Sequence, residues 1–412
     1  MAATHPSPGG RAFIVSAART PIGRYGGGLA SLSAPALGAV AIRAAIDGAD
    51  LPAGTAIDEV LMGEVLQAGV GQAPARQAAL GAGLPVQTAA TTINRVCGSG
   101  LKSIMLAAAE IAAGDADILV AGGMESMSRA PYLLTEARFG YRLGHGTIRD
   151  EAILDGLWCS LEDCHMGTHA ERVAAYAGVT RDEQDAYALE SHRRAIAAID
   201  AGRFVDEIAP VRVEDAKGRD SVVFGDECPR RDTTLSALAG LRPAFAPPAP
   251  EAGAAMTDAS VTAGNAPGLS DGAAATVVAS ERAVERLGLH PLARVVGYAQ
   301  ADVDPKWLFL APVAGIRRLL DRVEMPLDAF DLIELNEAFA AQVIADGREL
   351  GLDWSRVNVN GGAIALGHPI GASGARIVAT LVHELRRREG RYGLAALCLG
   401  GGGSVAMALE RV

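Results

Sequence analysis

The sequence predicts an α/β protein in which two similar halves flank an insertion. Three observations support this prediction. Half of the 412 residues are hydrophobic, whereas aromatic residues make up only 4% and glycine occupies 49 positions, so small residues allow helices to pack closely on sheets. Short β-branched runs alternate with alanine-rich helical stretches, as in layered α/β folds. The order of these elements occurs twice, which indicates an internal duplication.

Each half begins with a strand, a helix and a second strand. The predicted ranges are 12–16, 36–46 and 59–65 in the first half, and 293–298, 313–320 and 332–335 in the second. Because strands that alternate with helices are joined by crossovers, we expect parallel sheets covered on both faces.

Each half ends with a glycine-rich segment, a helix, a strand and a glycine turn. The predicted order is residues 94–100, a helix, a strand at 118–121 and a turn at Gly122 and Gly123 in the first half, and 371–374, a helix, 394–398 and 400–403 in the second. Both helices carry apolar residues at helical spacing on one side. These residues are Leu101, Ile104, Met105, Ala108 and Ile111, and Ile377, Val378, Leu381, Val382 and Leu385.

The duplication divides the chain into three parts. Residues 1–128 together with 259–282 form the predicted N-terminal half, and residues 283–412 form the C-terminal half. Residues 129–258 have no counterpart in the repeat, so they are predicted to be an inserted loop domain. The end of this insertion, at 243–250, is rich in proline and is predicted to be a loop.

Charge and cysteine usage narrow the class of protein. The 37 basic and 48 acidic residues give a net charge of −11, which argues against a nucleic-acid partner. The five cysteines are odd in number without paired spacing, so no disulfide framework is expected. The N-terminus lacks the basic start and apolar core of a secretory signal, and charged residues interrupt every long apolar stretch. We therefore expect a soluble cytoplasmic protein with no membrane partner.

The duplication also predicts where a reactive centre lies. The two glycine-rich helix starts occupy matching positions, so pseudo-twofold symmetry would bring them to one cleft suited to an anionic ligand. Cys97 directly precedes the first of these helices, where the helix dipole favours a thiolate and glycine N–H groups can stabilise an oxyanion. We therefore expect a lowered pKa for the Cys97 thiol. The alternative is a small buried side chain, the usual fate of an intracellular cysteine.

Three further residues are candidates for chemistry. His368, flanked by glycine and proline, precedes the second helix start and suits proton transfer; the alternative is a turn histidine bonded to backbone. Cys398 ends a predicted strand and is either a second acid/base or a packed strand residue. Asn336 follows the strand 332–335, at an edge where α/β sheets place functional groups, or it caps the next helix.

Metal and nucleotide sites receive less support. Cys159, Cys164, His165 and His169 are possible zinc ligands, but their spacing matches no zinc pattern, and adjacent Cys164 and His165 are poorly placed to bind one ion. The glycine runs lack the third glycine of a dinucleotide fingerprint and the lysine of a P-loop. We expect no metal.

Together these segments resemble the thiolases over nearly the whole chain, from about residue 11 to residue 407. The matching stretches are residues 18–23, 94–100, 122–128, 261–265, 336–339, 361–374 and 398–402. The resemblance implies duplicated βαβαβ halves in a layered α/β/α/β/α arrangement with an inserted loop domain, commonly as a homotetramer. It also implies cleavage of 3-oxoacyl-CoA, or condensation of two acyl-CoA molecules, through an acyl-cysteine intermediate.

The resemblance assigns roles by position. Cys97 falls on the acyl-accepting nucleophile, His368 on its base and Cys398 on the acid/base that exchanges a proton with acetyl-CoA. Asn336 falls on the residue that holds a water, forming one oxyanion hole with His368. The backbone N–H groups of Cys97 and Gly400 form the other. No cofactor is required, since coenzyme A is substrate and product.

Within the family, residues 164–167 resemble the short-chain biosynthetic type, in which His165 and Met166 shape a small acyl pocket. Arg230 falls near the adenine end of CoA. The remaining positions implied to contact substrate or CoA are Ala263, Pro267, Ala338 and Phe339. We therefore expect interconversion of two acetyl-CoA with acetoacetyl-CoA and CoA.

Three positions depart from the family pattern. Pro267 replaces a serine that contacts the CoA tail, Ser404 replaces the last glycine of the C-terminal motif, and residues 246–259 form an unusually long link. The alternatives are a 3-oxoacyl-CoA thiolase of broader chain length, a carrier-dependent ketosynthase, which normally uses two histidines, and a non-catalytic thiolase-like lipid-binding protein.

Overall fold

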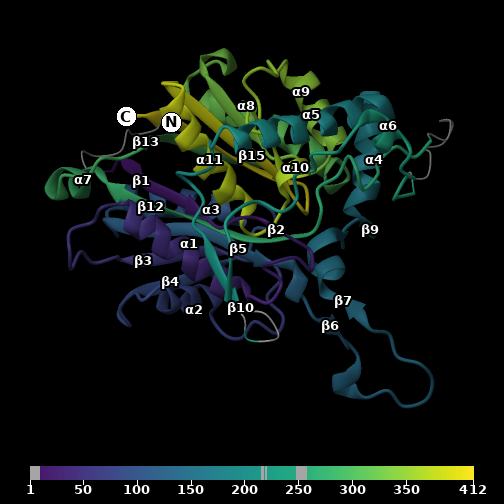
Figure 1. The fold of residues 1–412 in the computed structure, drawn as a ribbon, viewed down its shortest axis with the longest axis horizontal. Coiled ribbons are helices and arrows are strands. Elements are labelled where there is room, and N and C mark those ends of the chain that lie inside the picture. Colours follow the sequence, from purple (N-terminus) through teal and green to yellow (C-terminus); the bar gives the residue numbers. More distant parts are fainter. Residues whose placement is uncertain (1–9, 215–217, 219, 247–257) are drawn as a thin grey trace.

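A computed structural model describes residues 10–214, 218, 220–246 and 258–412, and Figure 1 shows the arrangement of its elements. The first half contains β1 (Ala12–Arg19), β2 (Gly23–Arg24), α1 (Ala34–Gly48), β3 (Glu59–Gly63), α2 (Pro74–Gly81), β4 (Ala89–Ile93), α3 (Ser99–Ala113), β5 (Ile118–Ser126), β12 (Ser270–Ser280) and α7 (Glu281–Leu287). The second half contains β13 (Ala293–Asp302), α8 (Ala311–Val323), β14 (Leu332–Leu335), α9 (Ala340–Leu350), α10 (Ala363–Leu366), α11 (Ser373–Arg387), β15 (Tyr392–Leu399) and β16 (Gly403–Arg411).

The ten strands of the central sheet confirm the predicted duplication. Nine follow the order β14-β15-β16-β13-β1-β12-β5-β3-β4, and β2 pairs with β12. The two halves join where Phe13 and Ile14 of β1 pair with Arg294 and Ala293 of β13. In the second half a single parallel bridge between Ile333 and Val357 stands where β4 pairs with β3 in the first.

The expectation of parallel sheets was wrong for one strand in each half. β12 runs antiparallel to β5, and β16 runs antiparallel to β15. The glycine turn after β15 explains the second case, because two strands joined by a tight turn must run in opposite directions. In the first half the long insertion separates β5 from β12, so no short turn in the sequence indicates that these two strands are antiparallel.

Gly122 and Gly123 do not form the predicted turn but lie within β5. A Cβ atom on Gly122 would lie 2.1 Å from the carbonyl oxygen of Ala274, and one on Gly123 would lie 2.0 Å from that of Gly371. These glycines therefore permit close backbone approach rather than chain reversal.

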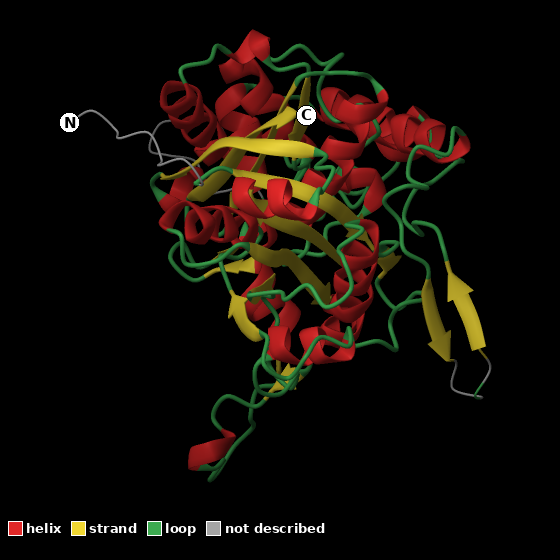
Figure 2. Ribbon diagram, turned by 90° about the vertical axis from the view of Figure 1, so that its left-hand side faces the viewer, coloured by secondary structure: helices red, strands yellow, loops and turns green. Residues whose placement is uncertain are grey.

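Helices α3 and α11 form the central layer between the two halves, where their apolar residues share one cluster with strands of both halves. Figure 2 shows this layering as helices that lie among strands. Their starts meet directly: a Cβ on Gly374 would lie 2.3 Å from the backbone nitrogen of Leu101. The segment Val96–Ala113 is apolar and long enough to cross a membrane. It is mostly α3, which packs inside the protein, so this is weak evidence for a membrane span.

The predicted insertion packs against both halves of the fold. It contains β6 (Tyr132–Leu133), β7 (Arg149–Asp150), β8 (Trp158–Cys159), β9 (Cys164–His165), α4 (Met166–Ala177), α5 (Arg181–Asp200), β10 (Val211–Glu214), β11 (Asp220–Val223) and α6 (Leu235–Ala239). The segment between β6 and β7 projects from the body (Figure 1). The exact domain boundaries stay predictions, and most of the long link at 246–259 lies outside the described residues.

Candidate active site

A cavity of about 380 Å³ collects most of the predicted site residues from both halves and the insertion. The reactive candidates that line it are Cys97, His368, Cys398 and Gly400, and the predicted substrate contacts are His165, Met166, Ala263, Pro267, Ala338 and Phe339. A larger cavity of about 700 Å³ lies between β1 and the end of α11 and contains none of these residues. The residues that line a cavity, rather than its volume, therefore identify the candidate site.

Local hydrogen bonds form the turn that presents Cys97 at the start of α3. Val96 has a left-handed backbone (φ 49°), and its N–H donates to the side-chain oxygen of Asn94 at 3.0 Å. The Ser99 hydroxyl donates to the carbonyl of Val96 at 2.6 Å. Gly98 follows directly, so Cys97 precedes the first turn of the helix.

The expected low pKa of Cys97 was wrong for the resting protein. Burial raises the thiol pKa to about 12, and the charge of Glu125 adds to the increase. Hydrogen bonds from the backbone N–H groups of Cys97 and Gly400 act in the opposite direction, but they do not outweigh the loss of water. Cys97 is thus a neutral thiol that needs a base, and the two N–H groups meet at its sulfur.

The hydrogen bonds of His368 assign its tautomer. Nδ1 lies 2.5 Å from the Ser373 hydroxyl, and that hydroxyl donates its one proton to the carbonyl of Pro369 at 2.9 Å. Ser373 must therefore accept from Nδ1–H, which leaves the lone pair on Nε2. The amide nitrogen of Asn336 donates toward Nε2 at 3.5 Å. Burial, followed by the charge of Arg376, lowers the imidazole pKa to about 3.

Two buried carboxylates hold the loop around His368, and sequence reasoning gave neither a role. Glu337 accepts from Ile364 N–H at 3.0 Å, and Glu125 accepts from Gly371 N–H at 2.9 Å. They therefore fix the backbone on both sides of the imidazole. Their positions inside the motifs 336–339 and 122–128 were the only sequence signal.

Asn336 is not a helix cap. Helix α9 begins at Ala340, its N-cap residue is Phe339, and no side chain caps it. The backbone N–H of Asn336 instead continues the pairing of β14 with β15, at 2.9 Å from Ala396 O. Within the described part of the chain, its buried side-chain oxygen has no hydrogen-bond partner, so that oxygen is free to hold a water or a ligand group.

Cys398 is packed as a strand residue, and its predicted acid/base role stays a prediction. It lies one residue before the end of β15, inside an apolar cluster with residues of α4 and α9, and it also lines the cavity. Its thiol pKa is raised well above the ordinary value by burial and, to a lesser extent, by Cys97 and Asp346. Cys398 therefore holds its proton at rest, which is the form needed in a general acid.

The apolar wall of the cavity comes largely from residues that sequence reasoning missed. His165 caps α4 by accepting from Gly167 N–H at 3.0 Å and stacks on Phe245 at 4.7 Å between ring centroids. Phe339 contacts both Phe245 and Phe309 edge to face. No periodic pattern marks Phe245 or Phe309, since they reach the cavity from separate connecting segments.

Arg230 lies outside this cavity but lines a second one of about 370 Å³. The two cavities share Ala263, Ala266, Gly268 and Leu269. Arg230 is held by its backbone N–H, which donates to Nδ1 of His192 at 3.1 Å. The two cavities are therefore adjacent, and Cys97 lines the first of them.

The four zinc candidates take different positions. Cys159 and Cys164 pair across β8 and β9, His165 lines the cavity, and His169 faces the carbonyl of Lys306. Across the described ranges, no group of three or more His, Cys, Asp or Glu residues is arranged to hold a metal ion.

A duplicated α/β fold with a cysteine, a histidine and a second thiol in one cavity defines a thiol-dependent acyl-transfer enzyme. The chain belongs to the thiolase family: residues 12–282 match its N-terminal domain and residues 289–411 its C-terminal domain.

Relatives agree with that assignment. The chain is 53% identical to an acetyl-CoA acetyltransferase of Pseudomonas aeruginosa and to one of Cupriavidus necator, over 97% of this chain and 98% of each relative. The crystal structure of the Bacillus anthracis acetyl-CoA acetyltransferase superposes with a TM-score of 0.93 at 42% identity, covering 99% of this chain and 100% of that chain.

Proposed function

We propose that this thiolase is an acetyl-CoA acetyltransferase that interconverts two acetyl-CoA with acetoacetyl-CoA plus CoA. The observation that carries the proposal is the single cavity in which Cys97, His368, Cys398 and Gly400 meet. Relatives at about half identity over nearly their full length bear the same activity in their names.

Cleavage of acetoacetyl-CoA begins at Cys97. His368 Nε2 takes the thiol proton, and the sulfur attacks the 3-keto carbon. The resulting oxyanion is stabilised by the N–H groups of Cys97 and Gly400, because both already point at the sulfur in the resting protein. The bond between the second and third carbons then breaks, leaving an acetyl group on Cys97 and the enolate of acetyl-CoA.

Cys398 completes carbon–carbon bond cleavage. Its thiol proton moves to the methylene carbon of the enolate, whose oxygen is held by His368 and an Asn336-bound water. The imidazolium of His368 returns its proton to the Cys398 thiolate. In the second half-reaction the CoA thiol passes its proton to Nε2, attacks the acetyl group and releases Cys97, which takes the proton back. Condensation follows the same steps in reverse.

The walls support a short acyl chain and an extended CoA tail. Met166, Phe245 and Phe339 crowd the cavity around the reactive groups, which favours acetyl and acetoacetyl groups over long chains. The tail passes between Ala263 and Pro267, with Arg230 in the second cavity at its adenine end.

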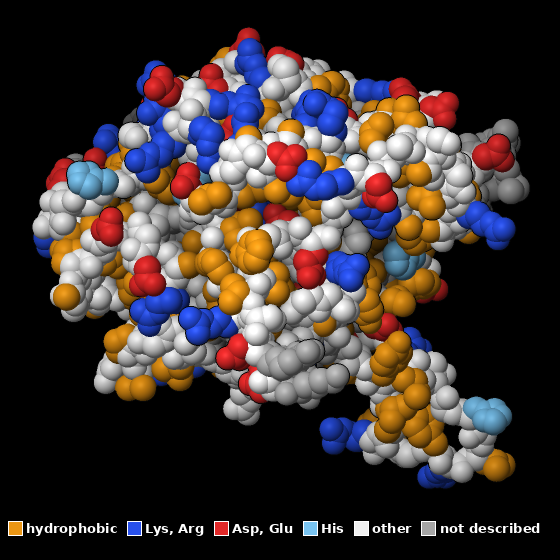
Figure 3. All heavy atoms as spheres, in the orientation of Figure 1, with side chains coloured by type: hydrophobic (Ala, Val, Ile, Leu, Met, Phe, Trp, Pro, Cys, Tyr) orange, Lys and Arg blue, Asp and Glu red, His pale blue; other side chains and the backbone are white. Residues whose placement is uncertain are grey.

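Assembly and location belong to the same proposal. The projecting segment between β6 and β7 exposes apolar side chains (Figure 3), including Leu134, Phe139, Leu143 and Ile148. Exposed apolar surface of this kind is typical of a subunit contact, and we propose the homotetramer that the family resemblance implies. All five cysteines are free, which suits the reducing cytoplasm.

The test is loss of acetoacetyl-CoA absorbance with and without added CoA. The proposal requires CoA-dependent cleavage that disappears in Cys97→Ala. Absence of cleavage in a folded protein would favour a lipid-binding role. A chain-length series from acetoacetyl-CoA upward tests specificity, and comparable rates on long-chain 3-oxoacyl-CoA would instead indicate the broader thiolase.

A further inference from the structure

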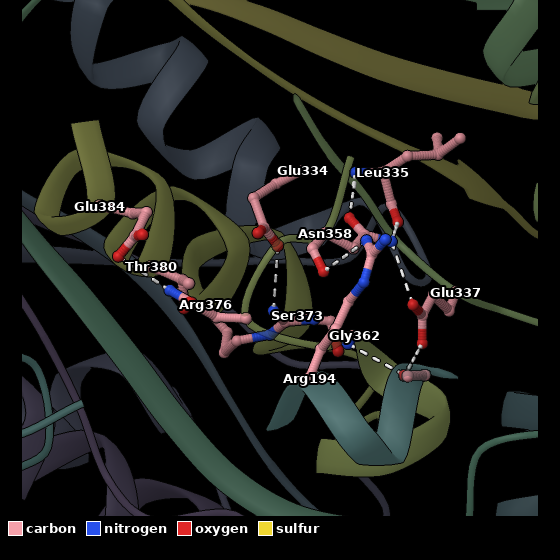
Figure 4. Close-up of polar contacts among 12 residues, drawn as sticks. Arg194, Glu334, Leu335, Glu337, Asn358, Gly362, Ser373, Arg376, Thr380 and Glu384 are labelled. Carbon is pink, nitrogen blue, oxygen red and sulfur yellow. Dashed lines mark hydrogen bonds and ion pairs between the residues drawn. The ribbon is translucent and has the colours of Figure 1, made fainter. Parts of the chain in front are cut away.

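Two charged groups that the proposed mechanism does not use form a buried pair close to His368. Arg376 on α11 and Glu334 on β14 are almost fully buried, and Nη1 of Arg376 lies 3.3 Å from Oε2 of Glu334. Figure 4 shows the pair bridging the helix and the strand, with Ser373 on the same helix.

The positions of the pair match those of the two side chains that contact the imidazole. Arg376 lies one helical turn beyond Ser373, so both lie on one face of α11. Glu334 lies two residues before Asn336, so both project to one side of the extended chain. Ser373 contacts Nδ1 of His368 and Asn336 contacts Nε2. The ion pair therefore joins the two elements that carry the two partners of His368.

Stability alone does not account for this pair. Burial raises the pKa of Glu334 to about 8 and lowers the pKa of Arg376, whereas the charge of each favours the charged form of the other. Apolar side chains of similar volume, which lose no such hydration, are often equally stable in place of a buried ion pair. The hydrogen bonding of this pair is also incomplete, because Nε of Arg376 has no hydrogen-bond partner within the described residues.

We propose that Arg376 and Glu334 are positioning residues that hold Ser373 and Asn336 at the two nitrogens of His368, so that the proton stays on Nδ1 and the lone pair on Nε2. This proposal rests on the proposed function, in which Nε2 is the base. Neither residue touches substrate; both act through the imidazole.

The charge of Arg376 supports the same role. Apart from burial, the charge of Arg376 is the one influence on the pKa of His368 that comes from the described residues, and it lowers that pKa. The charged groups that in turn act on Arg376 are Glu334, Arg19, Glu337 and Glu207. Removing the cation should therefore raise the pKa of the imidazole and move the acid limb of the pH–rate profile to higher pH.

The experiment compares Arg376→Met with Arg203→Met. Arg203 binds Glu384 farther along the same helix at 2.7 Å, so its loss removes an arginine–carboxylate bond without touching either partner of His368. We expect Arg376→Met to lower kcat about ten- to a hundred-fold with KM nearly unchanged, and to shift the acid limb upward. Arg203→Met should keep both kcat and the profile.

Nitrogen chemical shifts of ¹⁵N-labelled histidine give a substrate-free readout, with His368 assigned from His368→Gln. The unaltered protein should show the Nδ1–H tautomer, and Arg376→Met a mixture of tautomers. An unchanged tautomer together with unchanged kcat would overturn the proposal. If Arg376→Met does not fold, Glu334→Gln is measured in the same way. Inactivity of the unaltered protein with a normal tautomer would refute the proposed function alone.

Discussion

Glu64 is expected to make the stability of the fold depend strongly on pH. It directly follows β3, its side chain is 0% exposed, and neither carboxylate oxygen has a hydrogen-bond partner among the described residues. Burial, followed by the charges of Glu125 and Glu151, raises its pKa from 4.5 to about 8. The folded protein therefore keeps Glu64 protonated at neutral pH, whereas the unfolded chain ionises it.

The sign and size of the effect follow from that shift. A carboxyl whose folded pKa is raised leaves stability intact below the unfolded pKa. Stability is then lost as pH rises from the unfolded pKa to the folded pKa, and no further loss follows above it. Each pKa unit corresponds to about 1.4 kcal/mol, so a shift from 4.5 to about 8 removes about 3 kcal/mol at neutral pH and about 4–5 kcal/mol above about pH 8.

Glu64→Gln replaces the carboxyl with a neutral group of the same shape. We expect urea unfolding at fixed protein concentration to give similar free energies for both proteins near about pH 5. By about pH 8.5 the unaltered protein should have lost about 4 kcal/mol more than the variant. Parallel pH profiles for the two proteins would show that ionisation of Glu64 does not lower the free energy of unfolding, and the argument would be wrong.

Three further experiments test the site, and a fourth tests the close packing of β5. Acetyl-CoA should acetylate the Cys97 peptide, seen as a mass increase, and label elsewhere or in Cys97→Ala would contradict the nucleophile assignment. Cys398→Ala should still accept acetyl from acetyl-CoA but lose condensation, whereas equal loss of both steps would refute the separate roles. Pro267→Ser should restore a tail hydrogen bond of about 0.5–1.5 kcal/mol, lowering KM several-fold with kcat nearly constant; an unchanged KM in a folded variant would show that the contact is already replaced. Gly123→Ala should lower the free energy of unfolding by about 1–3 kcal/mol, because its Cβ would meet Gly371 O at 2.0 Å; an unaltered unfolding curve would contradict the close contact.

Much of the fold could be predicted because local pattern and global arrangement agree. The strand 332–335 was predicted with its observed limits, and the other repeated strands and helices begin or end within a few residues of their predicted positions. The errors occurred where the chain gives no local signal for a long-range contact. Gly122 and Gly123 look like a turn in sequence, but a carbonyl from another segment occupies the space that each Cβ would need.

The site residues could be predicted where the backbone geometry requires a recognisable residue type in the sequence. Cys97 and His368 stand out because glycines surround helix starts. Glu125 and Glu337 do not stand out, because a carboxylate that accepts backbone N–H groups looks like any other acidic residue in sequence. The pKa of Cys97 was misjudged for a related reason: a helix N-terminus can be read from sequence, whereas complete burial cannot.

The duplication explains why both halves are needed for one site. The two helix starts are equivalent, and so are the strands β5 and β15 that follow the two helices. Near the end of β5, Glu125 reaches the other half and accepts from Gly371 N–H, just before α11. After β15, the N–H of Gly400 reaches back and meets the sulfur of Cys97, just before α3. Each half therefore holds the helix start of the other, but with opposite chemistry. A carboxylate anchors the loop of the proposed base, and an N–H donor faces the proposed nucleophile, so the two equivalent strand ends differ in chemistry. In our proposal one of them supports a loop and the other takes part in catalysis.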